Sequence, residues 1–185
     1  MGCFAVLDTE TNWHDEVMSI GMVVADSTTM RVLDSRYYIF TPECEVGGMY
    51  SGVLELVRTV PTRYAMRDTA MEEIRQWLHS WSVSKLFAYN ACFDRNHLAE
   101  LSHFAWYDIM RIAAYRQHNV HIPADAPCCR TGRLKRDYGV EPMLRLLSGN
   151  RGYAETHNAL FDAEDELQIM KLLSLPLQRY EVAKL

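Results

Sequence analysis

Residues 3–10 read Cys-Phe-Ala-Val-Leu-Asp-Thr-Glu, an apolar run that ends in two acids. A short continuous apolar run of this kind predicts a buried strand. Side chains alternate between the two faces of a strand, so Asp8 and Glu10 lie on the same side of its end. A solvated strand end would carry the same common pair, but the apolar residues before it favour a strand that delivers both carboxylates to a sheet edge. We therefore interpret Asp8 and Glu10 as a candidate ligand pair.

Further apolar runs on the C-terminal side of this stretch predict a sheet. The runs at 17–25 and 31–40 flank a polar turn at 26–29, which gives three neighbouring strands. The compact apolar run at 85–89 predicts a short buried strand, and the chain then turns into a helix at 94–101.

Helices are predicted between and after these strands. A short helix is expected near 53–57. Thr69 and Glu72 match a capping box for a core-facing helix that begins around Asp68. Asp108 can cap another helix, whose inward residues would be Ile109, Ile112 and Ala113.

The closing segment carries the most regular helical pattern. Leu160, Leu167 and Met170 recur at helical spacing, and Pro176 ends the helix. Strands followed by a helix, a strand and further helices are typical of an α/β domain with helices packed on a mixed sheet. We expect residues 1–185 to form one domain, because 49% of them are hydrophobic and no linker divides the chain.

Two more acids and a histidine are candidates for the same site. Asp94 follows the strand predicted at 85–89, where an ordinary helix-start aspartate is the alternative. His157 and Asp162 are five residues apart, a spacing that leaves them on different faces of one α-helix. Both can face one site if His157 precedes the helix and Asp162 lies inside it. The alternative for His157 is a surface loop histidine.

Composition argues against several classes of protein. The formal net charge of −5 disfavours a protein that coats duplex nucleic acid with a broad basic face. No apolar run approaches the roughly 18 residues of a membrane helix, and we expect neither a membrane partner nor a secretory signal. The odd number of cysteines, five, favours a reducing, cytoplasmic setting. The absence of a Cys-x-x-Cys spacing argues against a zinc site.

Three segments, taken in order, resemble the motifs of the DEDDh family of 3′–5′ exonucleases. They are residues 4–11, Phe-Ala-Val-Leu-Asp-Thr-Glu-Thr; residues 89–94, Tyr-Asn-Ala-Cys-Phe-Asp; and residues 157–163, His-Asn-Ala-Leu-Phe-Asp-Ala. The family includes the proofreading subunit of bacterial DNA polymerase III, ribonuclease T and oligoribonuclease. The resemblance implies a ribonuclease-H-like fold and hydrolysis of single-stranded DNA or RNA from the 3′ end, with release of 5′-mononucleotides.

The resemblance also implies two divalent cations, Mg²⁺ or Mn²⁺, in each active site. Gathered carboxylates repel one another unless hard cations lie among them, and oxygen ligands suit these two metals. In the family's arrangement Asp8 bridges the ions, Glu10 and Asp162 complete the first site, and Asp94 supports the second. His157 would be the general base that takes a proton from the attacking water.

The chain departs from the family in two segments. Asn12-Trp13-His14 stands where many members carry Thr-Gly, and Val46-Gly-Gly-Met-Tyr50 replaces a His-Gly-Ile segment. These departures leave the catalytic ligands unchanged and put the identity of the substrate in doubt.

Three residues are candidates for contact with the 3′-terminal nucleotide. Thr11 and Trp13 are expected to touch it, Trp13 by stacking on the base, with a core position as the alternative for Trp13. Asn90 is expected to hydrogen-bond near the nucleotide, with a chain-turning role as the alternative. Phe93 is expected in the core.

The alternative function is a catalytically retired nucleic-acid-binding or interaction module on the same fold. The complete set of four acids and His157 disfavours it, because a retired site is free to lose any of them. The sequence leaves open DNA or RNA as substrate, and a homodimer or a polymerase-type partner as the working assembly.

Overall fold

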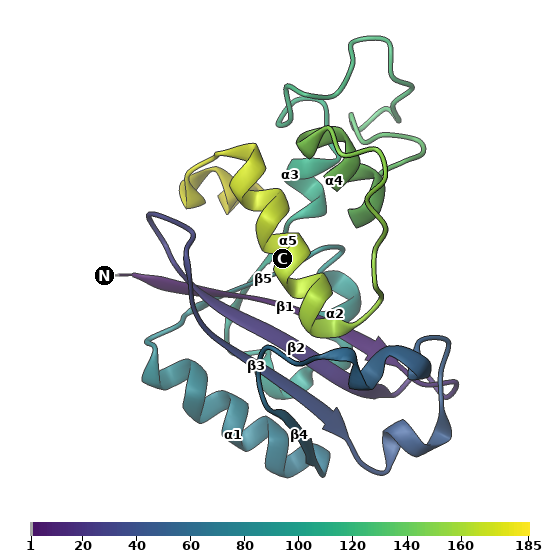
Figure 1. Cartoon of the computed structure of the whole chain (residues 1–185). Helices are drawn as coiled ribbons and strands as arrows, with labels where there is room; N and C mark the ends of the chain where they lie inside the picture. The colour runs from purple at the N-terminus through teal and green to yellow at the C-terminus, as the bar shows by residue number, and fades with distance from the viewer. Residues whose placement is uncertain (1) are drawn as a thin grey trace.

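The computed structural model describes residues 2–185 and has a six-stranded mixed sheet at its centre (Figure 1). The strands are β1 (Cys3–Thr11), β2 (Val17–Asp26), β3 (Val32–Phe40), β4 (Thr62–Ala65), β5 (Lys85–Ala88) and β6 (Ala105–Asp108). Their spatial order is β4-β3-β2-β1-β5-β6. β2 pairs antiparallel with both β1 and β3, whereas the other neighbouring pairs are parallel. The α/β class with a mixed sheet is therefore confirmed.

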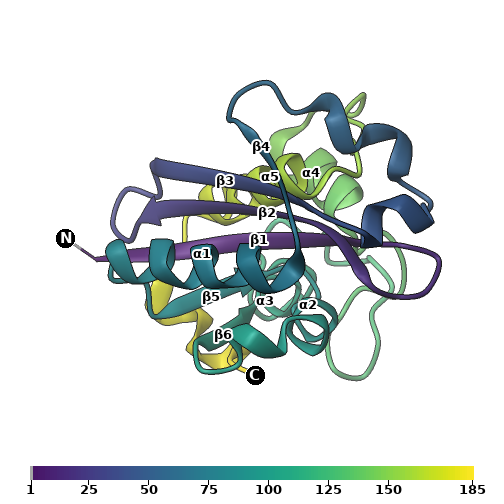
Figure 2. The same ribbon diagram turned by 90° about the horizontal axis from the view of Figure 1, so that it is seen from below.

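Helices cover both faces of this sheet. They are α1 (Arg67–Ser80), α2 (Cys92–His97), α3 (Met110–Ala113), α4 (Val140–Ser148) and α5 (Ala159–Leu173), with short 3₁₀ helices η1 (Glu43–Val46), η2 (Ser51–Leu56), η3 (Ala99–Leu101) and η4 (Leu177–Ala183). Figures 1 and 2 show α1 on one face and α5 on the other. None of the helices within residues 2–185 combines the length and the apolar composition that a membrane-spanning helix needs.

The central strand β1 serves both layers because its side chains alternate. Phe4 and Val6 pack in the apolar cluster that contains α5, whereas Ala5 and Leu7 pack in the cluster that contains α1. Asp8 and Glu10 continue the even-numbered series, so the strand directs both carboxylates toward the α5 side. All of Phe4 to Leu7 is fully buried, as the apolar run predicted.

Several predicted elements are confirmed. Strands occupy the three other predicted runs, and the 3₁₀ helix η2 (Ser51–Leu56) overlaps the helix expected near 53–57. Leu160, Ala163, Leu167 and Met170 are fully buried on α5. Ile109, Ile112 and Ala113 are likewise buried at α3. The N-cap residue of α3 is Ile109 and not Asp108, although the carboxylate of Asp108 accepts a hydrogen bond from the Met110 N–H.

The capping box predicted at Thr69 and Glu72 is wrong. α1 begins at Arg67, and its N-cap residue Met66 makes no side-chain hydrogen bond. Glu72 instead pairs with Arg75 on the exposed side of the helix. Burial of the apolar side of α1 against the sheet therefore fixes this helix without the cap.

Other boundaries also differ from the prediction. The helix expected at 94–101 begins two residues earlier, and α2 ends at His97 before η3. β4 and β6, each four residues long, were not predicted.

A glycine allows α5 to approach the sheet closely. Gly21 on β2 is the register partner of Asp8 on β1. A Cβ atom added to Gly21 would lie 2.1 Å from the backbone nitrogen of Leu160, in the first turn of α5. The absence of a side chain at Gly21 thus lets α5 bring Asp162 next to Asp8.

Candidate active site

Five carboxylates gather where β1 ends beneath α5 and beside α2. Asp8 and Glu10 come from β1, Asp94 from the first turn of α2, and Asp162 and Glu166 from α5. The negative charges of the other four each raise the pKa of Asp8, in addition to the larger effect of its burial. The structure therefore brings together the four acids that the sequence singled out, and it adds Glu166.

These carboxylates resist ionisation because they are buried beside one another. Burial is the largest cause in each case, and it raises the pKa of Glu10 to about 9, of Asp162 to about 8 and of Asp94 to about 7. The pKa of Glu166, which is 1% exposed, is raised for the same reason and by the charge of Asp94. A divalent cation among them would reverse this effect.

His157 lies beside the acids, directly before α5. It has a left-handed backbone (φ 57°), and its backbone N–H lowers the pKa of Asp162 by hydrogen bonding. Tyr50 stacks on its ring at 4.2 Å between centroids with 16° between planes. The arrangement matches the requirement inferred from the spacing, with His157 before the helix and Asp162 within its first turn.

Asn158 fixes the start of α5. Its side-chain oxygen accepts a hydrogen bond from the Leu160 N–H (3.2 Å), which caps the helix. Its amide donates to the hydroxyl of Tyr37 (3.1 Å) and the carbonyl of Val53 (2.9 Å). The segment that carries His157 is therefore tied to β3 and to η2.

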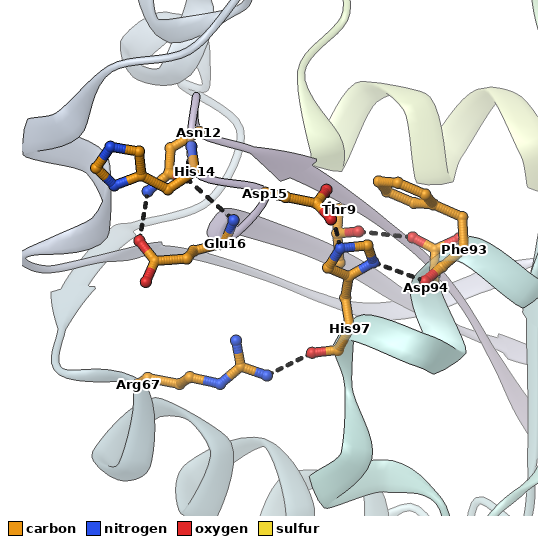
Figure 3. Close-up of polar contacts among 9 residues, drawn as sticks. All are labelled: Thr9, Asn12, His14, Asp15, Glu16, Arg67, Phe93, Asp94 and His97. Carbon is orange, nitrogen blue, oxygen red and sulfur yellow. Dashed lines mark hydrogen bonds and ion pairs between the residues drawn. The ribbon is translucent and has the colours of Figure 1, made fainter.

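Asp94 is held by contacts on the other side of the site, drawn in Figure 3. The hydroxyl of Thr9 donates to its carboxylate at 2.7 Å, and both side chains are buried. At the end of α2, His97 lies 3.2 Å from the carboxylate of Asp15, in the loop after β1. Arg67 of α1 donates to the His97 carbonyl. These contacts fix α2 against β1 and against α1.

The donor atoms fit a divalent cation. One ligand atom each from Glu10, His157 and Asp162 lie within 4.8 Å of one another. Within residues 2–185, the Oδ1 atom of Asp162 and the Oε2 atom of Glu166 are buried without a hydrogen-bond partner. Buried carboxylate oxygens need a partner, and a cluster of such oxygens is the donor set that hard cations prefer.

A cavity of about 340 Å³ adjoins the acids. Thr11 and Trp13 line it together with Met49 and Tyr50, which belong to the segment that departs from the family. Trp13 is 66% exposed, so the alternative that placed it in the core is wrong. Its expected contact with a nucleotide stays a prediction.

Phe93 differs from the expectation, and Asn90 fits the alternative in which it turns the chain. Phe93 was expected in the core but is 39% exposed, near Thr9 and Asp94 in Figure 3. Asn90 turns the chain: it is exposed, its backbone is left-handed (φ 62°), and its N–H donates to the Asp108 carboxylate at 3.0 Å. The hydrogen bond expected from Asn90 to a nucleotide stays a prediction.

The sequence reasoning missed three residues of this site. Glu166 was detectable, since it lies four residues after Asp162 and therefore on the same side of one helix. Asn158 was detectable as a favoured N-cap type before an apolar helix. Tyr50 gave no signal beyond its place in the unusual segment, because only the fold brings it to His157.

Comparison with known proteins identifies the fold. No protein-family model matches the sequence, and no curated protein matches it. Among solved structures, the nuclease domain of 3′hExo, a DEDDh family member bound to rAMP, aligns with a TM-score of 0.64 over 97% of this chain and 94% of that one. The chain has the fold of the DEDDh 3′-exonucleases. The fold expected from the three motifs is thereby confirmed, and at 13% identity the likeness establishes the fold alone.

Two further structures share this fold. Exonuclease I of E. coli in complex with a dT13 oligonucleotide aligns with a TM-score of 0.62 and 13% identity, over 97% of this chain and 42% of that one. A 3′-exonuclease that recognises a histone mRNA stem-loop aligns with a TM-score of 0.63 and 12% identity, over 94% and 64%. This chain thus spans less than two thirds of either protein.

Proposed function

We propose that this chain is a metal-dependent 3′–5′ exonuclease that removes 5′-mononucleotides from single-stranded DNA or RNA. One observation carries the proposal: buried carboxylates from β1, α2 and α5 meet beside His157, on a fold shared with 3′-exonucleases. The cavity lined by Thr11 and Trp13 next to these acids supports a site for the terminal nucleotide.

Different side chains would bind the metal ions, accept the proton and position these groups. Asp8, Glu10, Asp94 and Asp162 would hold two Mg²⁺ or Mn²⁺ ions, which when bound stabilise negative charge at the reacting phosphate. His157 would accept a proton from the water whose oxygen bonds to phosphorus, while the bond to the 3′ oxygen of the preceding nucleotide breaks. Tyr50 would keep the imidazole ring in place, and Thr9 would keep the Asp94 carboxylate in place.

The test uses end-labelled single-stranded DNA and RNA, incubated with Mg²⁺, with Mn²⁺ or with excess chelator. We expect release of 5′-mononucleotides from the free 3′ end, no reaction in chelator, and loss of activity in Asp8→Ala. A circular single strand should stay intact. Asp26→Ala is a matched control, because Asp26 lies on β2 and bonds Thr28 and Thr29 in the turn before β3, away from the acids.

Two results would contradict the proposal. One is full activity in chelator or cleavage of the circular strand. The other is binding of single strands without hydrolysis in either metal, which would favour a catalytically retired binding module.

A further inference from the structure

The connection between α3 and α4, residues 114–139, differs in charge from the rest of the chain. We call it the basic loop. Its five basic and two acidic side chains give +3, whereas the other 14 basic and 22 acidic side chains give −8. The basic residues are Arg116, Arg130, Arg133, Lys135 and Arg136. An acidic protein has thus gathered positive charge in one segment.

The basic loop is folded, although it contains no regular helix or strand. Tyr115 forms a β-bridge with Arg133, and Cys128 forms one with Leu134. Asn119 is 1% exposed and donates to the carbonyl of Ala113 at 2.7 Å. These contacts hold the basic side chains in defined places on a projection that Figure 1 shows beside α3 and α4.

Two of the five basic side chains have no partner inside the described part of the fold. Across residues 2–185, Arg136 is the only one of the five that has a carboxylate within 4.0 Å, and that pair, with Asp137, is exposed. Arg116 bonds a backbone carbonyl, and Arg133 stacks on Tyr138 at 4.4 Å. Arg130 and Lys135 are exposed, with no side-chain partner among residues 2–185.

The loop is anchored at the end of the sheet that carries the acids. The hydroxyl of Tyr89 donates to the carbonyl of Tyr138, near the end of the loop, at 2.5 Å. Tyr89 directly follows β5, and its backbone N–H lowers the pKa of Glu166 by hydrogen bonding. In Figure 1 the loop projects beyond α3 and α4, and in Figure 2 it lies on the side of the molecule where β1 ends.

A single-stranded nucleic acid bound at the gathered carboxylates needs a basic surface nearby for its other phosphates. The five gathered carboxylates attract cations and repel phosphates. Bound metal ions would therefore neutralise the charge of only the phosphate group at the metal site. Phosphates further along the strand require basic side chains that have no partner within the protein. Arg130 and Lys135 meet that requirement.

We propose that the basic loop binds the phosphate backbone of a single-stranded nucleic acid on the 5′ side of the nucleotide being removed, through Arg130 and Lys135. This inference rests on the proposed exonuclease function. It assigns the exposed charges a polyanionic ligand and predicts that long strands bind better than very short ones.

The test compares the double variant Arg130→Gln/Lys135→Gln with Arg31→Gln/Lys184→Gln. The control changes the net charge equally, at two exposed residues outside the loop. Affinity for a fluorescent oligothymidylate of about 20 nucleotides is measured by anisotropy over a range of salt concentrations. Hydrolysis of a dinucleotide in Mg²⁺ and the melting temperature are measured in parallel.

We expect the loop variant to bind the long strand about tenfold more weakly near 0.1 M salt. The slope of log affinity against log salt should become shallower by about 1.4, or 0.7 for each lost phosphate contact. Dinucleotide hydrolysis, melting temperature and the control variant should be unchanged.

Unchanged affinity and slope in the loop variant would overturn the proposal, as would an equal loss in the control. An equal loss for the dinucleotide would also overturn it, since a dinucleotide does not reach upstream phosphates. If the parent binds the long strand but hydrolyses neither substrate, the exonuclease proposal fails, while the binding comparison still decides the role of the loop.

Discussion

The segment at His157 is held by three interactions, one of which, the stacking of Tyr50, acts on the imidazole ring. Its backbone N–H bonds Asp162, Tyr50 stacks on the imidazole, and Asn158 caps the helix that follows. A general base must be held within hydrogen-bond reach of the proton that it takes, so this restraint suits the proposed role.

Replacement of His157 distinguishes the role of general base from the role of metal ligand. We expect His157→Ala to bind Mn²⁺ and substrate about as well as the parent and to turn over at least roughly a hundredfold more slowly. Single-turnover rates and equilibrium binding measured on the same preparation test this. Near-parental turnover would make His157 a bystander.

Tyr50 should act through His157 rather than through its hydroxyl. We expect Tyr50→Phe to keep the parental kcat, because the ring still stacks, and Tyr50→Ala to lower kcat by about tenfold as the imidazole loses its support. Comparison of kcat and KM in the two variants tests this. Equal losses in both would instead assign a role to the hydroxyl.

Trp13 is exposed beside the acids, so its removal should affect the substrate and not the core. We expect Trp13→Ala to weaken single-strand binding by about 1–3 kcal/mol and Trp13→Phe to retain most of it, because base stacking needs an aromatic face. The melting temperature should be unchanged in both. Parental affinity in the alanine variant would remove Trp13 from the binding site.

At the scale of elements, the site depends on how closely α5 approaches β2. We expect Gly21→Ala to cost about 1–3 kcal/mol or more of the free energy of unfolding, because its methyl group would overlap the backbone of α5. The helix must shift, so hydrolysis should fall even where the variant is folded. Gly52→Ala is the control, since a Cβ there has no atom within 4 Å. Urea unfolding with m-values tests both, and equal stability would contradict the close approach.

At the scale of the whole molecule, the buried acids couple stability to pH and metal. The folded-state pKa values of Asp94, Asp162 and Glu10, at about 7, 8 and 9, exceed the ordinary values of 3.8, 3.8 and 4.5. At pH values between the ordinary and the folded-state pKa of each acid, the folded protein therefore binds more protons than the unfolded chain. Their stabilising contribution is complete below pH about 4 and is lost as pH rises through 7 to 9.

We therefore expect the metal-free protein to melt at progressively lower temperature between pH 5 and 9, and added Mg²⁺ to oppose this loss most strongly at the alkaline end. Thermal unfolding with chelator or Mg²⁺ across this range tests the prediction. The variant Glu10→Gln/Asp162→Asn should show a flatter pH dependence. A metal-free protein that gains stability with rising pH would contradict the prediction.

The central strand, the positions of the candidate ligands and the closing helix could be predicted from the sequence. Each depends on local information: an apolar run marks β1, alternation sets the side of Asp8 and Glu10, and helical periodicity marks α5. The requirement that His157 precede the helix also followed from spacing alone, because five residues do not return to one helix face.

Which distant segments meet depends on the packing of the whole fold and could not be predicted from local sequence. The start of α1 is set by burial against the sheet and not by the Thr69–Glu72 pair. Strand β6 forms by pairing with the edge of β5. The approach of Tyr50 to His157, of Glu166 to Asp8 and of α5 to Gly21 all join residues far apart in the chain. No local pattern encodes such contacts, because they arise from the packing of α5 on the sheet.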